Sequence, residues 1–546
     1  MKRLALLVAV FQLLGLTAQE TGKAWVYFAN RGEVAERMMV VEQNFSEASI
    51  DRRARQGIEW QESDLPVLPE YIQALRADGL TIVHTSRWLN AVSVRIDENF
   101  DRWSRRSLPD FVTKVAPVEG WENAKPQPDA RVELKSTLEI DPNDYGDARQ
   151  QIEMIHGLEL HSVGLKGGGM RIAILDAGFN RADSMEVFDY IRSRNLVLGV
   201  RDFVDGGDSV YISSNHGTYV WSIMGAYLPQ LMIGTAPDAG YFLLRTEDIN
   251  SETTVEEDNW VAGAEWADSA GADLINSSLG YTRFDNNQGY TYEDMDGNTT
   301  VVTRGADAAA SKGILVVNSN GNYAQSDWIY MGAPADGDSV FSIGAVDREE
   351  QYALFSSIGP TYDGRLKPNV SALGEQTTIA LSNGATTRGN GTSFSAPVIC
   401  GMTASLWAAH PFRNNWGIMK AVEKSAHLAA RPNNQLGYGI PNYALAHELL
   451  TYGGENVPTV RSPWILYPNP FVDQLNIVLQ TEVSDDAVFR LSSVHGMRIS
   501  EVAFGGDYFL RLSLPPDLPA GTYLLEWWQN GERKAVEKVI RGNGIE

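Results

Sequence analysis

The fold class of this chain is decided by residues 171–178, RIAILDAG, in which an unbroken apolar run precedes Asp-Ala-Gly. Two similar runs follow, ADLINS at residues 272–277 and GILVVN at residues 313–318. Continuous apolar runs of this length are typical of strands in a parallel sheet that is covered on both faces. Helical patterns, such as residues 254–270, lie between them. The alternation predicts an α/β fold with a mostly parallel sheet over residues 145–452.

The composition of the chain is that of a large globular protein. Its 546 residues exceed one ordinary domain and predict several. With 43% hydrophobic and 21% charged residues it can bury a large core, which excludes disordered, collagen-like and coiled-coil proteins. The 45 Lys and Arg against 69 Asp and Glu give a formal net charge of −24, so we expect no nucleic-acid partner. The single cysteine, Cys400, excludes a disulfide within the chain.

The first residues have the pattern of an export signal. Lys2 and Arg3 precede an apolar stretch over residues 4–16, and Ala18 follows shortly after it. A membrane anchor is the alternative, but the stretch is shorter than the roughly 20 residues that cross a bilayer, and no later segment sustains such a run. We therefore expect a signal peptide over residues 1–18 and an exported mature chain without a membrane span. Export without disulfides favours a bacterial source.

Residues 19–118 form a first unit with the order strand, helix, strand, strand, helix, strand. The helices are expected at residues 69–77 and 97–107, and β-branched runs such as residues 91–96 indicate the strands. This is the split βαβ order of a small ferredoxin-like α+β domain. Residues 119–144 are polar and contain prolines, which is typical of an exposed linker.

Residues 460–546 form the last unit. Its apolar runs are short and alternate with polar residues, as in residues 475–479 and 522–527, and turns such as His495-Gly496 separate them. Short strands at regular spacing with turn signals between them predict a small β-sandwich.

Three segments of the central unit carry groups suited to nucleophilic catalysis. Asp176 follows an apolar strand, at the carboxyl edge where open α/β sheets place their sites. His216 opens one predicted helix and Ser393 another, in which Pro397 suits the first turn. A serine hydroxyl is a weak nucleophile unless an imidazole takes its proton, and the imidazole needs a buried carboxylate on its other nitrogen. Asp176, His216 and Ser393 can therefore form a catalytic triad.

The tetrahedral intermediate of such a reaction also needs hydrogen-bond donors for its oxygen. The backbone N–H of Ser393, at a helix start, is one candidate. The side-chain amide of Asn322, which follows the strand of residues 313–318, is the other.

These segments resemble those of the subtilisin-like serine peptidases, whose catalytic residues follow the chain order Asp, His, Ser. The motifs that carry the resemblance stand in the order of that family: NHGT at 215–218, SSLG at 277–280, NGN at 320–322, KPN at 367–369 and GTSFSAP at 391–397. The resemblance implies a subtilisin-like three-layer fold with Asp176, His216 and Ser393 as the triad and Asn322 as the oxyanion donor.

The same resemblance implies a substrate-binding edge strand that pairs with the substrate backbone, and a second segment that helps to flank the pocket for the residue before the cut. These segments comprise Ser277, Ser278, Leu279, Gly280, Ser319, Asn320 and Gly321. Two residues depart from the family pattern. Ala177 replaces the usual hydroxyl residue after the aspartate, and Tyr281 follows where a small residue is common.

The resemblance implies an exported serine endopeptidase that acts on proteins or peptides and requires no cofactor. The alternative is a catalytically silent surface binding protein that keeps the peptidase fold. A fluorophosphonate probe discriminates between them, because it labels only an activated serine. The Gly-x-Ser-x-Gly elbow of a different serine-hydrolase class is absent around Ser393.

The stretch DMDGN at residues 294–298 offers oxygen ligands around a glycine. Asp294, Asp296 and Asn298 are candidate ligands for a structural calcium ion. The EF-hand pattern is incomplete, because no glutamate occupies its closing position, and a turn without an ion is the alternative.

Both flanking units resemble parts of exported bacterial proteins. The first resembles subtilisin-like propeptides, partly through SRWLNAVSV at residues 86–94, which implies cleavage within residues 119–144; a permanent accessory domain is the alternative. The last resembles the C-terminal sorting domains of the type IX secretion system of Bacteroidota, through LYPNPF at residues 466–471 and LPAGTY at residues 518–523. This implies the type IX machinery as a partner and a cell-surface or secreted location, whereas a carbohydrate- or protein-binding sandwich is the alternative.

Overall fold

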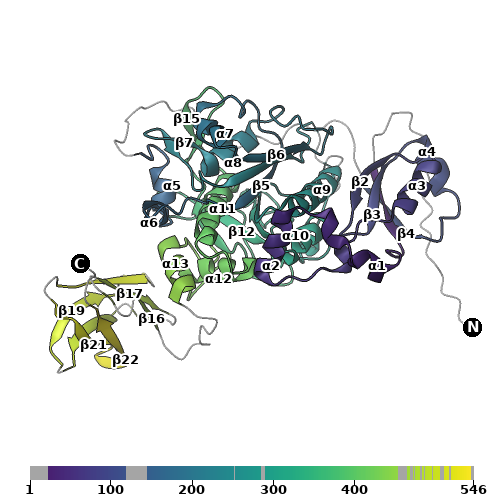
Figure 1. The fold of residues 1–546 in the computed structure, drawn as a ribbon. Helices are drawn as coiled ribbons and strands as arrows, with labels where there is room; N and C mark the ends of the chain where they lie inside the picture. The colour runs from purple at the N-terminus through teal and green to yellow at the C-terminus, as the bar shows by residue number, and fades with distance from the viewer. Residues whose placement is uncertain are drawn as a thin grey trace, which may run out of the picture.

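The computed structural model describes residues 23–118, 144–250, 253–284 and 289–452, together with 464–467, 471, 474–479, 483–484, 486–494, 496–504, 509–515 and 518–542. The predicted signal peptide and nearly all of the predicted linker lie outside the described residues. An N-terminal and a C-terminal unit lie on opposite sides of a larger central unit (Figure 1).

The central unit is built on a seven-stranded sheet with the order β13-β12-β11-β10-β5-β9-β6, in which every neighbouring pair is parallel. The strands are β5 (Arg171–Asp176), β6 (Val197–Asp202), β9 (Gly240–Arg245), β10 (Leu274–Ser277), β11 (Leu315–Ser319), β12 (Phe341–Val346) and β13 (Val370–Leu373). The parallel sheet that the apolar runs predicted is confirmed.

Helices cover both faces of this sheet, and this explains the unbroken apolar strands. The helices are α8 (His216–Gly225) and α11 (Thr392–Ala408) on one face and α9 (Val255–Ala270) and α10 (Val301–Ser311) on the other. In β5, Ile172 and Ile174 pack in the first core, whereas Ala173 and Leu175 pack in the second. Because successive side chains of a strand point to opposite faces, every position must be apolar. The result is a subtilisin-like three-layer fold.

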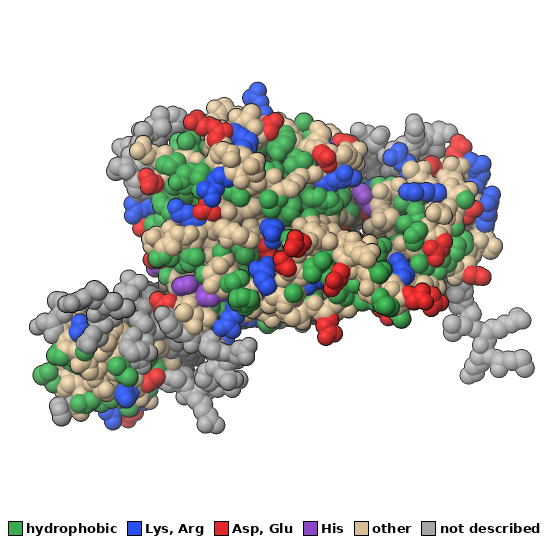
Figure 2. All heavy atoms as spheres, in the orientation of Figure 1, with side chains coloured by type: hydrophobic (Ala, Val, Ile, Leu, Met, Phe, Trp, Pro, Cys, Tyr) green, Lys and Arg blue, Asp and Glu red, His purple; other side chains and the backbone are tan. Residues whose placement is uncertain are grey.

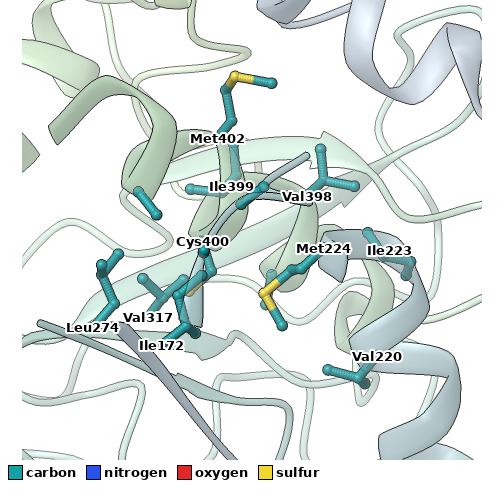
Figure 3. Packing of buried hydrophobic residues seen from close by; sticks show 14 of the residues in the cluster. Ile172, Val220, Ile223, Met224, Leu274, Val317, Val398, Ile399, Cys400 and Met402 are labelled. Carbon is teal, nitrogen blue, oxygen red and sulfur yellow. The ribbon is translucent and has the colours of Figure 1, made fainter. Parts of the chain in front are cut away.

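Figure 3 shows part of the first core. Cys400 of α11 lies among Ile172, Leu274 and Val317 of the sheet, with Met224 of α8 nearby. Its thiol is free and fully buried, and burial raises the thiol pKa, so Cys400 is an inert core residue.

Smaller elements complete the central unit. They are α5 (Arg149–Glu153), α6 (Gly157–Ser162), η3 (Glu186–Phe188), α7 (Asp189–Ser193), β7 (Tyr227–Leu228), β8 (Met232–Ile233), η5 (Tyr292–Asp294), β14 (Thr377–Ala380), β15 (Thr386–Gly389), α12 (Asn415–Ser425) and α13 (Tyr443–Tyr452). In the described parts of the chain, no helix combines the length and the hydropathy that a membrane span requires.

The N-terminal unit has an antiparallel sheet with the order β2-β3-β1-β4. Its main elements are β1 (Lys23–Phe28), α3 (Pro69–Ala77), β2 (Ile82–Ser86), β3 (Ala91–Arg95), α4 (Glu98–Ser104) and β4 (Val112–Val118), which is the predicted order. Helix α4 begins after Asp97, whose carboxylate accepts hydrogen bonds from the backbone N–H groups of Asn99 and Phe100. It ends at Ser104, earlier than the predicted range of 97–107.

Between β1 and α3 the structure contains elements that the sequence pattern did not predict. They are α1 (Val34–Met38), η1 (Val41–Asn44), α2 (Glu47–Gln56) and η2 (Glu62–Asp64). Ser46 caps the start of α2 by accepting from the Ser49 N–H, and Gly57 ends it in the left-handed conformation with φ 67°. Helix α2 lies against the central unit, where the Ser46 N–H donates to the Ser269 carbonyl at 2.9 Å (Figure 1).

The C-terminal unit consists of two antiparallel sheets, with the orders β16-β17-β20 and β19-β18-β21-β22. The strands are β16 (Trp464–Tyr467), β17 (Gln474–Leu479), β18 (Val488–Ser493), β19 (Arg498–Ala503), β20 (Phe509–Ser513), β21 (Gly521–Gln529) and β22 (Glu532–Arg541). One apolar cluster contains buried side chains from both sheets, among them Trp464, Leu475, Phe489 and Leu525. The predicted antiparallel β unit is therefore present.

Candidate active site

A buried aspartate, Asp176, pairs with the partly exposed His216 at the carboxyl edge of the sheet. Asp176 ends β5 and is fully buried, and His216 is the first residue of α8. The His216 Nδ1 atom lies 2.9 Å from Asp176 Oδ1 and 3.0 Å from Asp176 Oδ2. A buried carboxylate requires such a partner, and this contact places the Nδ1 proton toward the aspartate. The Nε2 atom is then the proton acceptor of the ring.

Two glycines permit this close approach of β5 and α8. Gly178 has φ 139°, and a Cβ there would lie 2.3 Å from the Ile212 carbonyl oxygen. A Cβ at Gly217 would lie 2.5 Å from the Gly178 carbonyl oxygen. Neither position has room for a side chain, so the glycines beside Asp176 and His216 determine how near the two catalytic candidates can come.

Ser393 lies in the first turn of α11 and faces the same place. Its side chain is buried, and its Oγ donates to the Ser278 carbonyl oxygen at 3.2 Å. The Ser278 Oγ in turn donates to the Ser393 carbonyl oxygen at 2.9 Å. The ring of the next residue, Phe394, stacks near the His216 ring, with their centroids 6.1 Å apart. The structure thus pairs Asp176 with His216 and places the start of α11 beside the His216 ring, whereas the role of Asp176, His216 and Ser393 as a catalytic triad stays a prediction.

Asn322 lies beside the start of α11. Its side-chain oxygen Oδ1 accepts from the Thr392 backbone N–H at 2.9 Å and from Thr392 Oγ1 at 3.0 Å. Because the two Thr392 donors both require an oxygen acceptor, the amide of Asn322 is oriented with Oδ1 toward Thr392. Its Nδ2 atom therefore faces away from Thr392. Thr392 also accepts from the Gly321 N–H at 3.1 Å. The sequence pattern indicated Asn322 but not Thr392, although Thr392 stands next to Ser393 in the GTS motif at residues 391–393.

The seven residues predicted to contact substrate lie on two neighbouring segments, residues 277–280 and residues 319–321. Asn318 Nδ2 and Ser319 Oγ both donate to the Leu279 carbonyl oxygen, at 3.1 Å and 3.5 Å, and so join the segments. Both segments contact the start of α11, because Ser278 bonds to Ser393 and Gly321 bonds to Thr392.

Two of these seven side chains point into the protein. Ser277 Oγ accepts from Trp260 Nε1 at 3.0 Å, and Asn320 Oδ1 accepts from Ser342 Oγ at 2.6 Å. Both residues are fully buried, so their side chains serve the fold.

The calcium candidates make local hydrogen bonds. Asp294 Oδ2 accepts from the Thr291 N–H at 2.7 Å, and Asp296 Oδ1 accepts from the N–H groups of Asn298 and Thr299, both at 2.8 Å. Among the described residues there is no group of three or more His, Cys, Asp or Glu side chains suited to a metal ion. Calcium binding by Asp294, Asp296 and Asn298 stays a prediction.

A serine near an imidazole that is paired with a buried carboxylate, at the carboxyl edge of a parallel sheet, defines the class of serine hydrolases. The chain belongs to the subtilase family, because the model of that family, peptidase S8, matches residues 167–439. The model of the peptidase S8 propeptide domain of Bacteroidota matches residues 23–131. The N-terminal unit is therefore a propeptide of the Bacteroidota type.

Curated relatives of this chain include Bacillus enzymes. Subtilisin NAT of Bacillus subtilis subsp. natto is 31% identical over 279 residues, which cover 50% of this chain and 65% of that protein. Subtilisin of Bacillus pumilus is 30% identical over 279 residues, which cover 50% of this chain and 90% of that protein. The chain thus spans less than two thirds of the length of Subtilisin NAT.

Solved structures with a related fold include MycP1 from Mycobacterium smegmatis. The match has 18% sequence identity and a TM-score of 0.46, and it covers 60% of this chain and 89% of the MycP1 chain.

Proposed function

We propose that the chain is an exported serine endopeptidase that hydrolyses peptide bonds through an acyl-enzyme on Ser393. The observation that carries the proposal is the Asp176 and His216 pair, joined at 2.9 Å, beside the start of α11, where the Phe394 ring that follows Ser393 lies 6.1 Å from the His216 ring. The family membership supports it, because subtilases are serine peptidases.

In the proposed reaction, His216 Nε2 takes the proton of Ser393 Oγ as that oxygen attacks the carbonyl carbon of the peptide bond. Asp176 stabilises the imidazolium that forms. The carbonyl oxygen becomes negative and accepts hydrogen bonds from Asn322 Nδ2 and the Ser393 N–H. His216 then returns its proton to the leaving amine, and a water molecule hydrolyses the acyl-enzyme by the reverse sequence of steps.

In the structure, the Ser393 hydroxyl donates to an acceptor other than His216. Ser393 Oγ donates to the Ser278 carbonyl at 3.2 Å, so a rotation about one side-chain bond is needed to direct its proton to His216. The substrate backbone pairs with residues 278–280, which adds a strand to an exposed edge.

The two flanking units extend the proposal to processing and export. The propeptide covers the peptidase unit until cleavage within residues 119–144, where the family match ends at residue 131. The C-terminal β unit serves as a sorting domain that the type IX secretion machinery recognises, and the enzyme reaches the cell surface or the medium. The motif LYPNPF at residues 466–471 supports this part of the proposal.

Intact mass and N-terminal sequencing of wild type and Ser393→Ala, paired with casein hydrolysis, test the whole proposal. We expect wild type to be cleaved within residues 119–144 and to hydrolyse casein, and Ser393→Ala to do neither. If both proteins keep the propeptide and neither hydrolyses casein, the peptidase proposal is contradicted and a binding function takes its place.

A further inference from the structure

The inference concerns the residue before the cut, and it rests on the proposed function. The reacting carbonyl must lie about 3 Å from both Ser393 Oγ and Asn322 Nδ2. The side chain of the residue before the cut branches from the carbon next to that carbonyl. It must therefore pass beside Asn322, between residues 278–280 and residues 319–321, which the structure places side by side.

The phenol ring of Tyr323 already lies in this place. Its hydroxyl donates to the Gly280 carbonyl oxygen at 3.1 Å, so the side chain reaches from one segment to the other. A Cβ at Gly321 would lie 2.8 Å from both Cδ2 and Cε2 of the ring, and a Cβ at Gly332 would lie 3.3 Å from Cε2. Three glycines, on three separate stretches of chain, thus surround the ring and leave room for it.

The backbone of Tyr323 is held as well. Its N–H donates to Ser357 Oγ at 2.9 Å, and its carbonyl oxygen accepts from the N–H groups of Ser326 at 2.8 Å and Ile329 at 3.2 Å. The ring therefore cannot withdraw by a shift of the loop without breaking these contacts. It must rotate, and rotation breaks the hydrogen bond to the Gly280 carbonyl.

We propose that Tyr323 determines the specificity of the enzyme by filling the space for the residue before the cut. The substrates are then peptides with a small residue there, Gly, Ala or Ser. A large residue such as Phe or Leu must displace the ring from its contacts with Gly280, Gly321 and Gly332 before the peptide bond can reach Ser393.

Peptide substrates that differ only in the residue before the cut, Ala or Phe, test this on the mature enzyme. We expect wild type to favour Ala over Phe by about tenfold or more in kcat/KM. Tyr323→Ala should raise kcat/KM for the Phe substrate about tenfold or more and change that for Ala much less. Tyr323→Phe keeps the ring and should keep the preference for Ala.

Tyr362→Ala is the matched control. Tyr362 is an exposed tyrosine whose ring centroid lies 5.6 Å from that of Tyr292. Its loss should leave the ratio of kcat/KM for the Ala and Phe substrates unchanged. A wild type that hydrolyses the Phe substrate as well as the Ala substrate overturns the proposal, even if Tyr323→Ala fails to fold. An unchanged ratio in folded Tyr323→Ala overturns it as well.

Fluorophosphonate labelling of the same preparations separates the two proposals. A wild type that is labelled at Ser393 and shows no preference for small residues contradicts only the role of Tyr323. A folded, mature wild type that is neither labelled nor active contradicts the peptidase function and, with it, the inference.

Discussion

At the residue scale, the amide of Asn322 is oriented before any substrate arrives. The Thr392 N–H and Oγ1 both donate to its oxygen, at 2.9 Å and 3.0 Å, and so leave Nδ2 as the atom that donates to the reacting carbonyl in the proposed mechanism. A donor that needs no reorganisation stabilises the oxyanion more than one that must first turn. Thr392 is thus a positioning residue for Asn322.

The first prediction separates the donor from the residue that positions it. Asn322→Ala should lower kcat about 100- to 1000-fold with little change in KM, because the lost hydrogen bond forms mainly in the transition state. Thr392→Val removes one of the two bonds that hold the amide and should lower kcat about fivefold. Steady-state kinetics on one peptide measures both, with Thr392→Ser as the control that keeps the hydroxyl. A normal kcat in Asn322→Ala would remove Asn322 from the proposed mechanism.

The sequence predicted which residues meet but not what surrounds them. Asp176, His216 and Ser393 follow strand ends and helix starts, and a parallel sheet brings these to one edge. The hydrogen bonds of Thr392 and the place of Tyr323 depend on how closely separate loops approach one another. That approach is set by packing, such as the closeness of Gly178 and Gly217, and a residue spacing does not reveal it.

At the element scale, helix α2 is another case in which the local sequence does not reveal the contacts that a segment makes. Its sequence, EASIDRRARQ, is mostly polar and charged, as in a solvated segment, yet Arg52 and Arg53 are fully buried against the peptidase unit. Their shared partner is Asp268, with Arg53 Nη2 3.0 Å from Asp268 Oδ2. The partner lies 215 residues away from Arg53, so nothing local to α2 could predict it.

The second prediction concerns this buried ionic contact between propeptide and peptidase unit. Asp268→Ala leaves Arg52 and Arg53 buried without that shared carboxylate and should destabilise the protein by about 3–5 kcal/mol. Denaturant unfolding in the Ser393→Ala background, which keeps the chain uncleaved, measures it.

Asp189→Asn is the control for that prediction, because the Asp189 carboxylate is largely exposed and its pairing with Arg192 should contribute little. Equal stabilities of Asp268→Ala and Asp189→Asn would mean that the buried contact contributes no net stability.

The third prediction concerns the pH dependence of the free energy of unfolding, which arises from Glu257 of helix α9. Burial raises the pKa of Glu257 to about 7 from its ordinary 4.5, although Tyr290 and the Val302 N–H donate to its carboxylate. A carboxyl with a raised pKa binds its proton more tightly in the folded state. Its contribution to stability is therefore complete below pH 4.5 and is lost as the pH rises through 7.

Glu257→Gln removes this titration. Between pH 4.5 and 7, the free energy of unfolding of the unsubstituted protein should fall by about 3 kcal/mol relative to that of Glu257→Gln. Denaturant unfolding at several pH values, again with Ser393→Ala, gives the difference. Glu293→Gln changes an exposed carboxylate of the short helix η5 and should reproduce the pH profile of the unsubstituted protein. A Glu257→Gln profile parallel to that of Glu293→Gln would contradict the prediction.

At the scale of the whole molecule, the chain consists of units that each have their own core. The C-terminal sheets share one apolar cluster, and the propeptide has another, although its Trp88 packs in the second core of the peptidase unit. The face in Figure 2 carries charged side chains of both signs, interspersed with apolar and other polar ones, although the whole chain has a net charge of −24.

The fourth prediction follows from these separate cores. A chain that ends at residue 452 keeps every element from α5 to α13 and should retain its fold and its activity on peptides. Circular dichroism and kcat/KM, compared with the full chain after maturation of both, measure the effect. A loss of activity by more than about tenfold in a folded product would show that the C-terminal unit contributes to the site.

The central claim is that Ser393 is an activated nucleophile, and fluorophosphonate labelling followed by peptide mapping tests it most directly. We expect mature wild type to be labelled at Ser393 alone, His216→Ala to be labelled at least about 100-fold more slowly, and Ser393→Ala not to be labelled. Folded mature wild type without a label on Ser393, or with equal labelling in His216→Ala, would contradict it.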